Sequence, residues 1–114
     1  MRSPEEIVRA QVEAYNRQDM EAFIAAFHVE AEFIRWPDRV LHRGHAVFRE
    51  RYGALWARAP RLRALIHNRT VVGRFVSDLE ELVGHPDGER PPMLVIYETS
   101  DDCIRRFWVI ANDS

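Results

Sequence analysis

The chain of 114 residues has the length of one domain, because domains cluster near about 100 to 150 residues. Hydrophobic residues make up 46% and aromatic residues 11% of the sequence, which excludes a disordered chain. A formal net charge of -2 argues against general attraction to nucleic acid or anionic lipid, and the single cysteine, Cys103, excludes an intrachain disulfide and a cysteine-based zinc site.

The arginines are concentrated in the middle of the chain. Every basic residue other than histidine is Arg, so lysine Schiff-base and amine-nucleophile mechanisms are excluded. Eight arginines lie within residues 35–63, against only Asp38 and Glu50. We interpret this run as the outer faces of a helix and strands that pair with flanking carboxylates; nucleic-acid binding is the alternative.

The N-terminal residues predict a helix and lack the apolar stretch that a signal peptide needs. Ser3 suits the N-cap, Pro4 the first helical position, and Glu6 the residue that closes a capping box. Apolar residues then recur at helical spacing up to Arg17. No later run is long enough to span a membrane, so we expect a cytoplasmic protein.

A second, shorter helix follows Asp19, which suits its N-cap. Its bulky residues recur with the helical period and are expected to be buried on one face: Met20, Phe23, Ile24 and Phe27. From Glu30 the period changes to two, which predicts a strand that ends at the turn Pro37-Asp38.

The rest of the sequence predicts one more helix and a series of strands. A short extended segment, residues 39–42, leads to Gly44 and to a helix that Pro60 ends. Residues 61–72 and 75–83 flank the two-residue turn Gly73-Arg74, and a last hairpin joins residues 93–100 to residues 103–110. Helices segregated from an antiparallel sheet define an α+β fold, and we expect one domain over residues 1–114.

Three segments of the chain resemble known proteins in the same order. They are residues 14–33, with Ala-Tyr-Asn-Arg-Gln-Asp and later Ala-Glu-Phe; residues 44–52; and residues 101–108. The set resembles the SnoaL-like and ketosteroid isomerase-like families of the NTF2-like superfamily. The resemblance implies a cone in which a strongly curved mixed or antiparallel sheet packs against three helices of the N-terminal half. It also implies one small-molecule pocket and, often, a homodimer formed through the outer face of the sheet.

The catalytic residues of the isomerases do not carry over onto this sequence. By the resemblance, the oxyanion tyrosine falls at Gln11, the aspartate base at Arg35 or Trp36, and the protonated aspartate near Ile96. Only the supporting tyrosine is matched, by Tyr52. Because a guanidinium stays protonated, an arginine cannot act as a general base, and isomerisation by that mechanism is not expected.

Two charged residues are candidates for chemistry in such a pocket. Glu98 is the candidate acid or base beside Tyr52, if the strand face that it shares with Ile96 is the inner one; the alternative is a carboxylate that faces solvent. Arg35 would bind a carboxylate or phosphate group from the pocket wall, or else lie at the rim or in a dimer salt bridge. The Asp-Arg-Asp site of epoxide hydrolases in the superfamily stays open, since Arg35, Asp78 and Glu98 supply the residue types.

The remaining candidates would bind the ligand. With Arg35, the expected pocket residues are Gln11, Tyr15, Phe27, Phe33, Trp36, Trp56, Ile96 and Phe107. His67 is a weaker candidate, as a partner of Glu98. His42 and His45 are three residues apart but straddle a turn, so no metal site is predicted, and no cofactor motif is present.

The resulting hypothesis is a pocket protein that binds a small, largely apolar organic molecule. Cofactor-free acid/base chemistry of the isomerase, hydrolase or cyclase type is an option that the sequence leaves open. The alternative is a non-catalytic module for dimerisation or partner binding, as the resemblance also allows.

Overall fold

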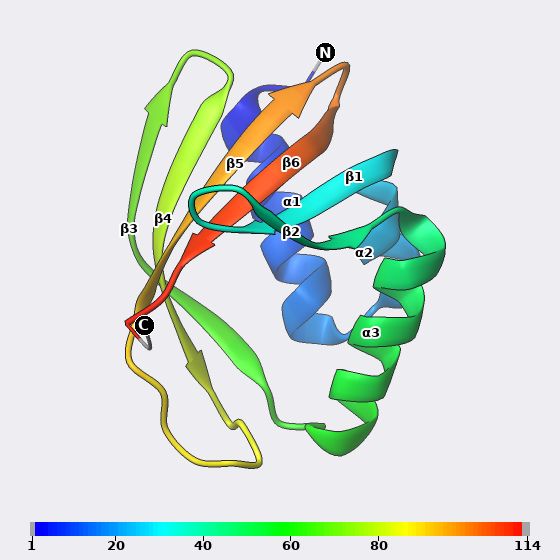
Figure 1. The fold of residues 1–114 in the computed structure, drawn as a ribbon, viewed down its shortest axis with the longest axis vertical. Helices are drawn as coiled ribbons and strands as arrows, with labels where there is room; N and C mark the ends of the chain where they lie inside the picture. Colours follow the sequence, from blue (N-terminus) through cyan, green and yellow to red (C-terminus); the bar gives the residue numbers. More distant parts are fainter. Residues whose placement is uncertain (1, 113–114) are drawn as a thin grey trace.

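The computed structural model describes residues 2–112 and consists of three helices and one six-stranded sheet (Figure 1). The helices are α1 (Pro4–Arg17), α2 (Met20–Ala25) and α3 (His45–Arg58). The strands are β1 (Phe27–Arg35), β2 (Arg39–Arg43), β3 (Arg63–Val72), β4 (Phe75–Val83), β5 (Met93–Ser100) and β6 (Cys103–Ile110). No helix in this part of the chain has the length and apolar character needed to cross a bilayer.

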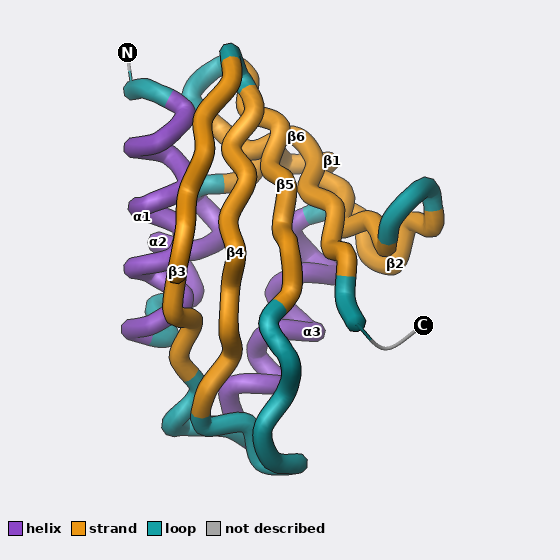
Figure 2. Tube along the Cα trace, turned by 90° about the vertical axis from the view of Figure 1, so that its left-hand side faces the viewer, coloured by secondary structure: helices purple, strands orange, loops and turns teal. Residues whose placement is uncertain are grey.

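The sheet is mixed and strongly curved (Figure 2). Its strand order is β2-β1-β6-β5-β4-β3, in which β1 and β6 are parallel and all other neighbours are antiparallel. The three helices lie on one side of the sheet, and the other side carries no helix (Figures 1 and 2). The predicted α+β class and the curved sheet are confirmed.

Local signals account for the ends of the elements. The capping box at Ser3 forms in full: its hydroxyl accepts from the Glu6 backbone N–H at 3.1 Å, and the Glu6 carboxylate accepts from the Ser3 N–H at 2.9 Å. Asp101 and Asp102 both have positive φ, 55° and 63°, as the two central residues of a type I′ hairpin turn do. This turn joins β5 to β6 and helps to set the register of that strand pair.

One predicted boundary is wrong. Phe27 is not the last apolar residue of α2 but the first residue of β1, which starts three residues earlier than the alternation from Glu30 indicates. The change of element leaves Phe27 in the same core, where its ring centroid lies 5.0 Å from that of Phe23. Phe27 therefore fits the helical spacing of α2 because it is buried in the same core, although it is not part of the helix.

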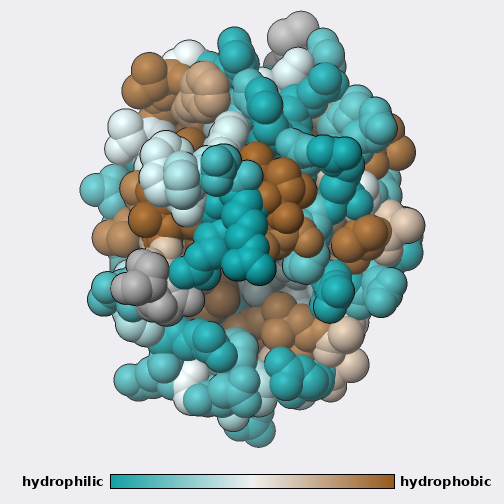
Figure 3. Space-filling model, in the orientation of Figure 1, coloured by the Kyte–Doolittle hydropathy of each residue, from teal (hydrophilic) through white to brown (hydrophobic). Residues whose placement is uncertain are grey.

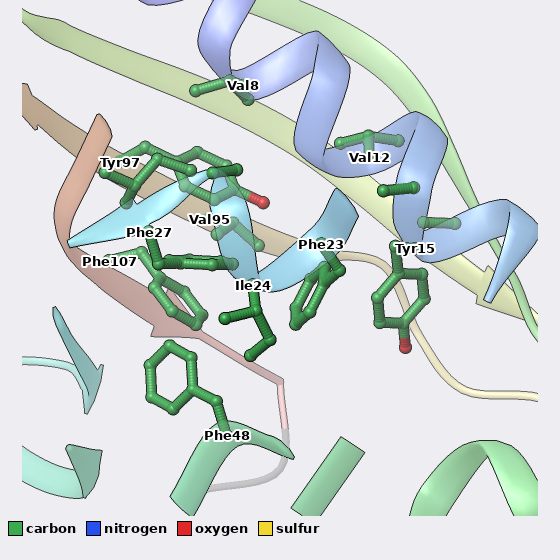
Figure 4. Close-up of a cluster of buried hydrophobic side chains, with 14 of the residues drawn as sticks. Val8, Val12, Tyr15, Phe23, Ile24, Phe27, Phe48, Val95, Tyr97 and Phe107 are labelled. Carbon is green, nitrogen blue, oxygen red and sulfur yellow. The ribbon is translucent and has the colours of Figure 1, made fainter. Parts of the chain in front are cut away.

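The core lies between the helices and the inner face of the sheet. Aromatic rings from the helices and from β1, β5 and β6 converge there, and Figure 4 shows several of them together: Tyr15, Phe23, Phe27, Phe48, Tyr97 and Phe107. Two arginines of the basic middle segment pair with carboxylates outside this core. Arg43 pairs with Glu32 and Arg49 with Glu21, as the interpretation of an outer charged surface expects.

Candidate functional site

A cavity of about 170 Å³ lies between α1, α3 and the inner face of the sheet. Most of its lining is aromatic or aliphatic, with few polar groups, which is the usual composition of a small-molecule site. The lining residues are Gln11, Tyr15, Phe33, Tyr52, Leu55, Glu80, Leu82, Met93, Val95, Tyr97, Phe107 and Val109. We refer to it below as the tyrosine cavity.

Strand alternation determines which side chains reach the tyrosine cavity. Glu80 and Leu82 of β4 lie two residues apart, as do Val95 and Tyr97 of β5 and Phe107 and Val109 of β6, so each pair lies on one face. The register places neighbours side by side on that face: Tyr97 opposite Phe107, and Val95 opposite Val109. Ring centroids of Tyr97 and Phe107 are 5.7 Å apart, and the rings are stacked.

Glu80 is the one charged residue among the lining side chains of the described chain. Within residues 2–112, the carboxyl group of Glu80 forms no hydrogen bond and no ion pair. Burial raises the pKa of Glu80 from its ordinary 4.5 to about 7; the negative charge of Asp78 raises it further, and Arg69 opposes the shift. The carboxyl group can therefore both accept and give up a proton near neutral pH.

A buried ion pair lies next to Glu80 on the same sheet face. Asp78 is fully buried and receives two hydrogen bonds from Arg69, from Nε at 2.7 Å and from Nη2 at 2.9 Å. This bidentate geometry satisfies both carboxylate oxygens. The charges of Asp78 and Arg69 offset each other, so Arg69 is not available as a counter-ion for Glu80.

The other polar groups of the cavity are neutral. Burial raises the pKa of Tyr15, Tyr52 and Tyr97 above the ordinary value, so their hydroxyl groups remain protonated and can donate. Gln11 Oε1 is buried without a hydrogen-bond partner in the described chain, as is Trp56 Nε1 behind the tyrosines. An unsatisfied buried acceptor is costly, and a ligand donor would relieve that cost.

The structure brings five of the predicted pocket residues to the tyrosine cavity: Gln11, Tyr15, Phe33, Tyr52 and Phe107. Two more, Phe27 and Trp56, lie in the aromatic layer behind it. The Trp56 ring centroid is 5.7 Å from that of Tyr15, and the Phe27 ring centroid is 5.5 Å from that of Phe107.

Glu98 and Ile96 do not join Tyr52. On β5 the residues that reach the cavity are the odd-numbered ones, so Ile96 and Glu98 point to the outer face. Glu98 binds Arg106 Nε at 2.7 Å and Arg74 Nε at 3.2 Å, and lines a separate charged depression of about 410 Å³. The hydrogen bond from Arg106 and then that from Arg74 lower the pKa of Glu98, which opposes an acid/base role.

The other candidates also lie outside the cavity lining. Arg35 ends β1, and Trp36 is 51% exposed at the turn that follows. His67 contacts the Glu81 carboxylate at 2.8 Å on the outer face.

His42 packs on Phe33, whereas His45 Nε2 lies 2.8 Å from the Phe27 carbonyl oxygen. Within residues 2–112, no three His, Cys, Asp or Glu side chains lie close enough to hold a metal ion.

The residue that sequence reasoning missed is Glu80. In β4 both faces mix acidic and apolar side chains: Val76, Asp78, Glu80 and Leu82 on one, and Phe75, Ser77, Leu79 and Glu81 on the other. The alternation therefore does not indicate which face is buried. The only signal was indirect, namely that one of two adjacent glutamates on a predicted strand must point inward.

Solved structures show which fold class the chain belongs to. An uncharacterised cystatin-fold protein from Novosphingobium aromaticivorans is 25% identical, with a TM-score of 0.86 over 96% of this chain and 99% of that one. An NTF2-like protein of unknown function from Cytophaga hutchinsonii is 11% identical, with a TM-score of 0.81 over 98% and 92%. A putative polyketide cyclase from Sinorhizobium meliloti is 20% identical, with a TM-score of 0.77 over 90% and 92%. The class is therefore the NTF2-like, cystatin-like α+β fold.

The family follows from the sequence itself. The model of the SnoaL-like domain matches residues 8–107, and the chain belongs to the SnoaL-like family. The resemblance seen in the sequence is thereby confirmed. No curated protein matches the chain in sequence.

Proposed function

We propose that the protein binds a small, largely apolar organic molecule in the tyrosine cavity and performs cofactor-free acid/base chemistry on it with Glu80. The observation that carries this proposal is the unpartnered Glu80 carboxyl group in an otherwise neutral, mostly apolar cavity, with a pKa raised to about 7. The reaction class is that of an isomerase, hydrolase or cyclase.

The roles of the neighbouring groups follow from their chemistry. Glu80 transfers a proton to or from the ligand, because general acid/base catalysis works best with a group that titrates near the working pH. The protonated hydroxyl groups of Tyr15, Tyr52 and Tyr97 donate to a ligand oxygen on which negative charge develops. Gln11 Oε1 orients a ligand donor.

The test is a thermal-shift screen of small cyclic and aromatic compounds, followed by turnover assays on the hits. Glu80→Gln should lower turnover by about a hundredfold or more, the usual contribution of a positioned acid or base. Glu81→Gln is the matched control, since it alters the adjacent residue of β4 on the outer face and should leave turnover unchanged.

The outcomes separate binding from catalysis. If a hit binds and is converted equally well by Glu80→Gln and wild type, the acid/base role is refuted. If no compound stabilises the wild-type protein, the proposal of a ligand cavity is refuted as well.

A second proposal concerns assembly. We infer a homodimer through the outer face of the sheet, because this face carries no helix and exposes apolar side chains: Leu65 at 43%, Phe75 at 37% and Leu79 at 39%. Exposed apolar side chains on a sheet face without helices are typical of protein interfaces.

A further inference from the structure

The charge balance of the tyrosine cavity is negative when Glu80 is ionised. No arginine or histidine belongs to the cavity lining of the described chain, and Arg69, the cation whose charge acts on Glu80, is held by Asp78. An ionised carboxylate in such surroundings lacks a counter-charge, which is costly in a largely apolar site. A ligand that carries a positive charge would supply it.

The aromatic lining favours a cation as well. Five rings from five elements line the cavity: Tyr15 (α1), Tyr52 (α3), Phe33 (β1), Tyr97 (β5) and Phe107 (β6). Ring centroids of Phe33 and Phe107 are 4.7 Å apart, and those of Tyr15 and Tyr52 are 6.1 Å apart, so neighbouring rings of the lining contact each other. Aromatic faces carry negative quadrupole charge and attract cations that lie within about 6 Å.

The apolar part of the lining favours a cation that carries alkyl groups. The hydrogen-bond acceptors of the lining are the Glu80 carboxylate, Gln11 Oε1 and the tyrosine hydroxyl groups, and the remaining side chains are apolar. An N–H group that pointed at these apolar side chains would lose its hydrogen bond, whereas an alkyl group would not. Alkyl groups on the nitrogen would instead pack against Leu55, Leu82 and Val109.

We propose that the tyrosine cavity binds a small tertiary or quaternary alkylammonium ion, with the Glu80 carboxylate as its counter-ion and the aromatic rings around its alkyl groups. This inference deepens the proposed function, since it names the ligand class of the same cavity and rests on that function. With such a cation bound, Glu80 stays ionised and acts as a base rather than as an acid.

Binding of the cation must depend on pH, because it requires the carboxylate form. The ionisable groups around Glu80 are Asp78 and Arg69 on β4 and β3, and the tyrosines of α1, α3 and β5. Arg69 is held by Asp78 and the tyrosines are neutral, so the competing proton is that of Glu80. Affinity should rise about tenfold per pH unit below a pH of about 7 and level off above it.

The experiment is isothermal titration calorimetry with choline and with its neutral carbon isostere, in which a tert-butyl group replaces the trimethylammonium group. At a pH of about 8, choline should bind wild type and Glu81→Gln at least about tenfold more tightly than the isostere. Glu80→Gln should remove that preference. In wild type, choline affinity should fall about a hundredfold when the pH is lowered to about 5.

Each result decides the inference. Isostere binding that equals or exceeds choline binding in wild type overturns the cation proposal and leaves the proposed function standing. Choline binding that is independent of pH also overturns it. If neither compound binds, the cation proposal fails, and a neutral ligand found in the screen would still support the proposed function. The wild-type comparisons do not depend on the folding of any variant.

Discussion

Glu80 and Glu98 show how surroundings assign different chemistry to one residue type. Both lie on central strands of the same sheet, but on opposite faces. Glu98 is held by two arginines, which lower its pKa, whereas Glu80 has no such partner and burial raises its pKa to about 7. Only Glu80 can exchange a proton at neutral pH.

The raised pKa of Glu80 predicts a pH dependence of stability. The folded state holds a proton on Glu80 up to a pH of about 7, and the unfolded chain only up to its ordinary pKa of 4.5. The stabilising contribution is therefore complete below the lower value and is lost as the pH rises through the higher one. Relative to wild type, Glu80→Gln should gain about 1–3 kcal/mol in free energy of unfolding between pH of about 4 and about 8.

Urea denaturation of the two proteins at both pH values measures this difference. Glu81→Gln, on the outer face, should show no comparable change with pH. A difference between Glu80→Gln and wild type that stays constant over the range would contradict the raised pKa.

Among the elements, α1 is joined to the edge of the sheet by the side chain of Asn16, which makes the hydrogen bonds that a further strand would make. β3 is an edge strand, and Ala64 near its start is buried. Asn16 Nδ2 donates to the Ala64 carbonyl oxygen at 3.0 Å, and the Ala64 N–H donates to Asn16 Oδ1 at 2.7 Å. The amide thus satisfies both backbone groups as a neighbouring strand would. This contact also holds the part of α1 that carries Gln11 and Tyr15 over the cavity.

Asn16→Ala should destabilise the protein by about 2–4 kcal/mol, because it leaves a buried donor and a buried acceptor without partners. Ser3→Ala is the comparison, since it removes the exposed capping box of the same helix and should cost only about 1 kcal/mol. Thermal or chemical denaturation ranks the two variants. An Asn16→Ala loss equal to or below that of Ser3→Ala would show that the contact is not needed to hold α1.

Over the whole molecule, the two faces of the sheet have different surroundings. The inner face is covered by the helices and holds the cavity, whereas the outer face meets solvent (Figures 1 and 2). In the space-filling view, hydrophobic areas interrupt the hydrophilic surface (Figure 3). The charged depression around Glu98, Arg74 and Arg106 also lies on the outer side of the sheet. The proposed dimer would cover the apolar part of this face.

Leu79→Asp should convert the dimer into a monomer, because it places a charge on the outer face, where Leu79 is 39% exposed. Val47→Asp is the matched control: Val47 is 37% exposed but lies on α3, and its substitution should leave the molecular mass unchanged. Light scattering after size-exclusion chromatography distinguishes the two. A wild-type protein that is monomeric at micromolar concentration would contradict the dimer.

The sequence by itself determined the α+β class, the helix starts, the hairpin turns and the family. Caps, turns and periodicity are local properties, so Ser3, Asp19 and the aspartates at 101 and 102 act the same way in any tertiary context. Aromatic pocket residues such as Tyr15 and Tyr52 were also predictable, because their helical spacing marks a buried face.

Only the tertiary structure decided which face of each central strand is covered. β4 carries acidic and apolar residues on both faces, and β5 carries Glu98 beside Ile96 on one face and Tyr97 beside Val95 on the other. Strand alternation separates the two faces without telling which one the helices cover. Strand pairing settled that choice: β4 places Val76 opposite Tyr97 and Asp78 opposite Val95, so the β4 face that carries Glu80 is covered by the helices together with the buried face of β5, whereas Glu98 lies on the other face.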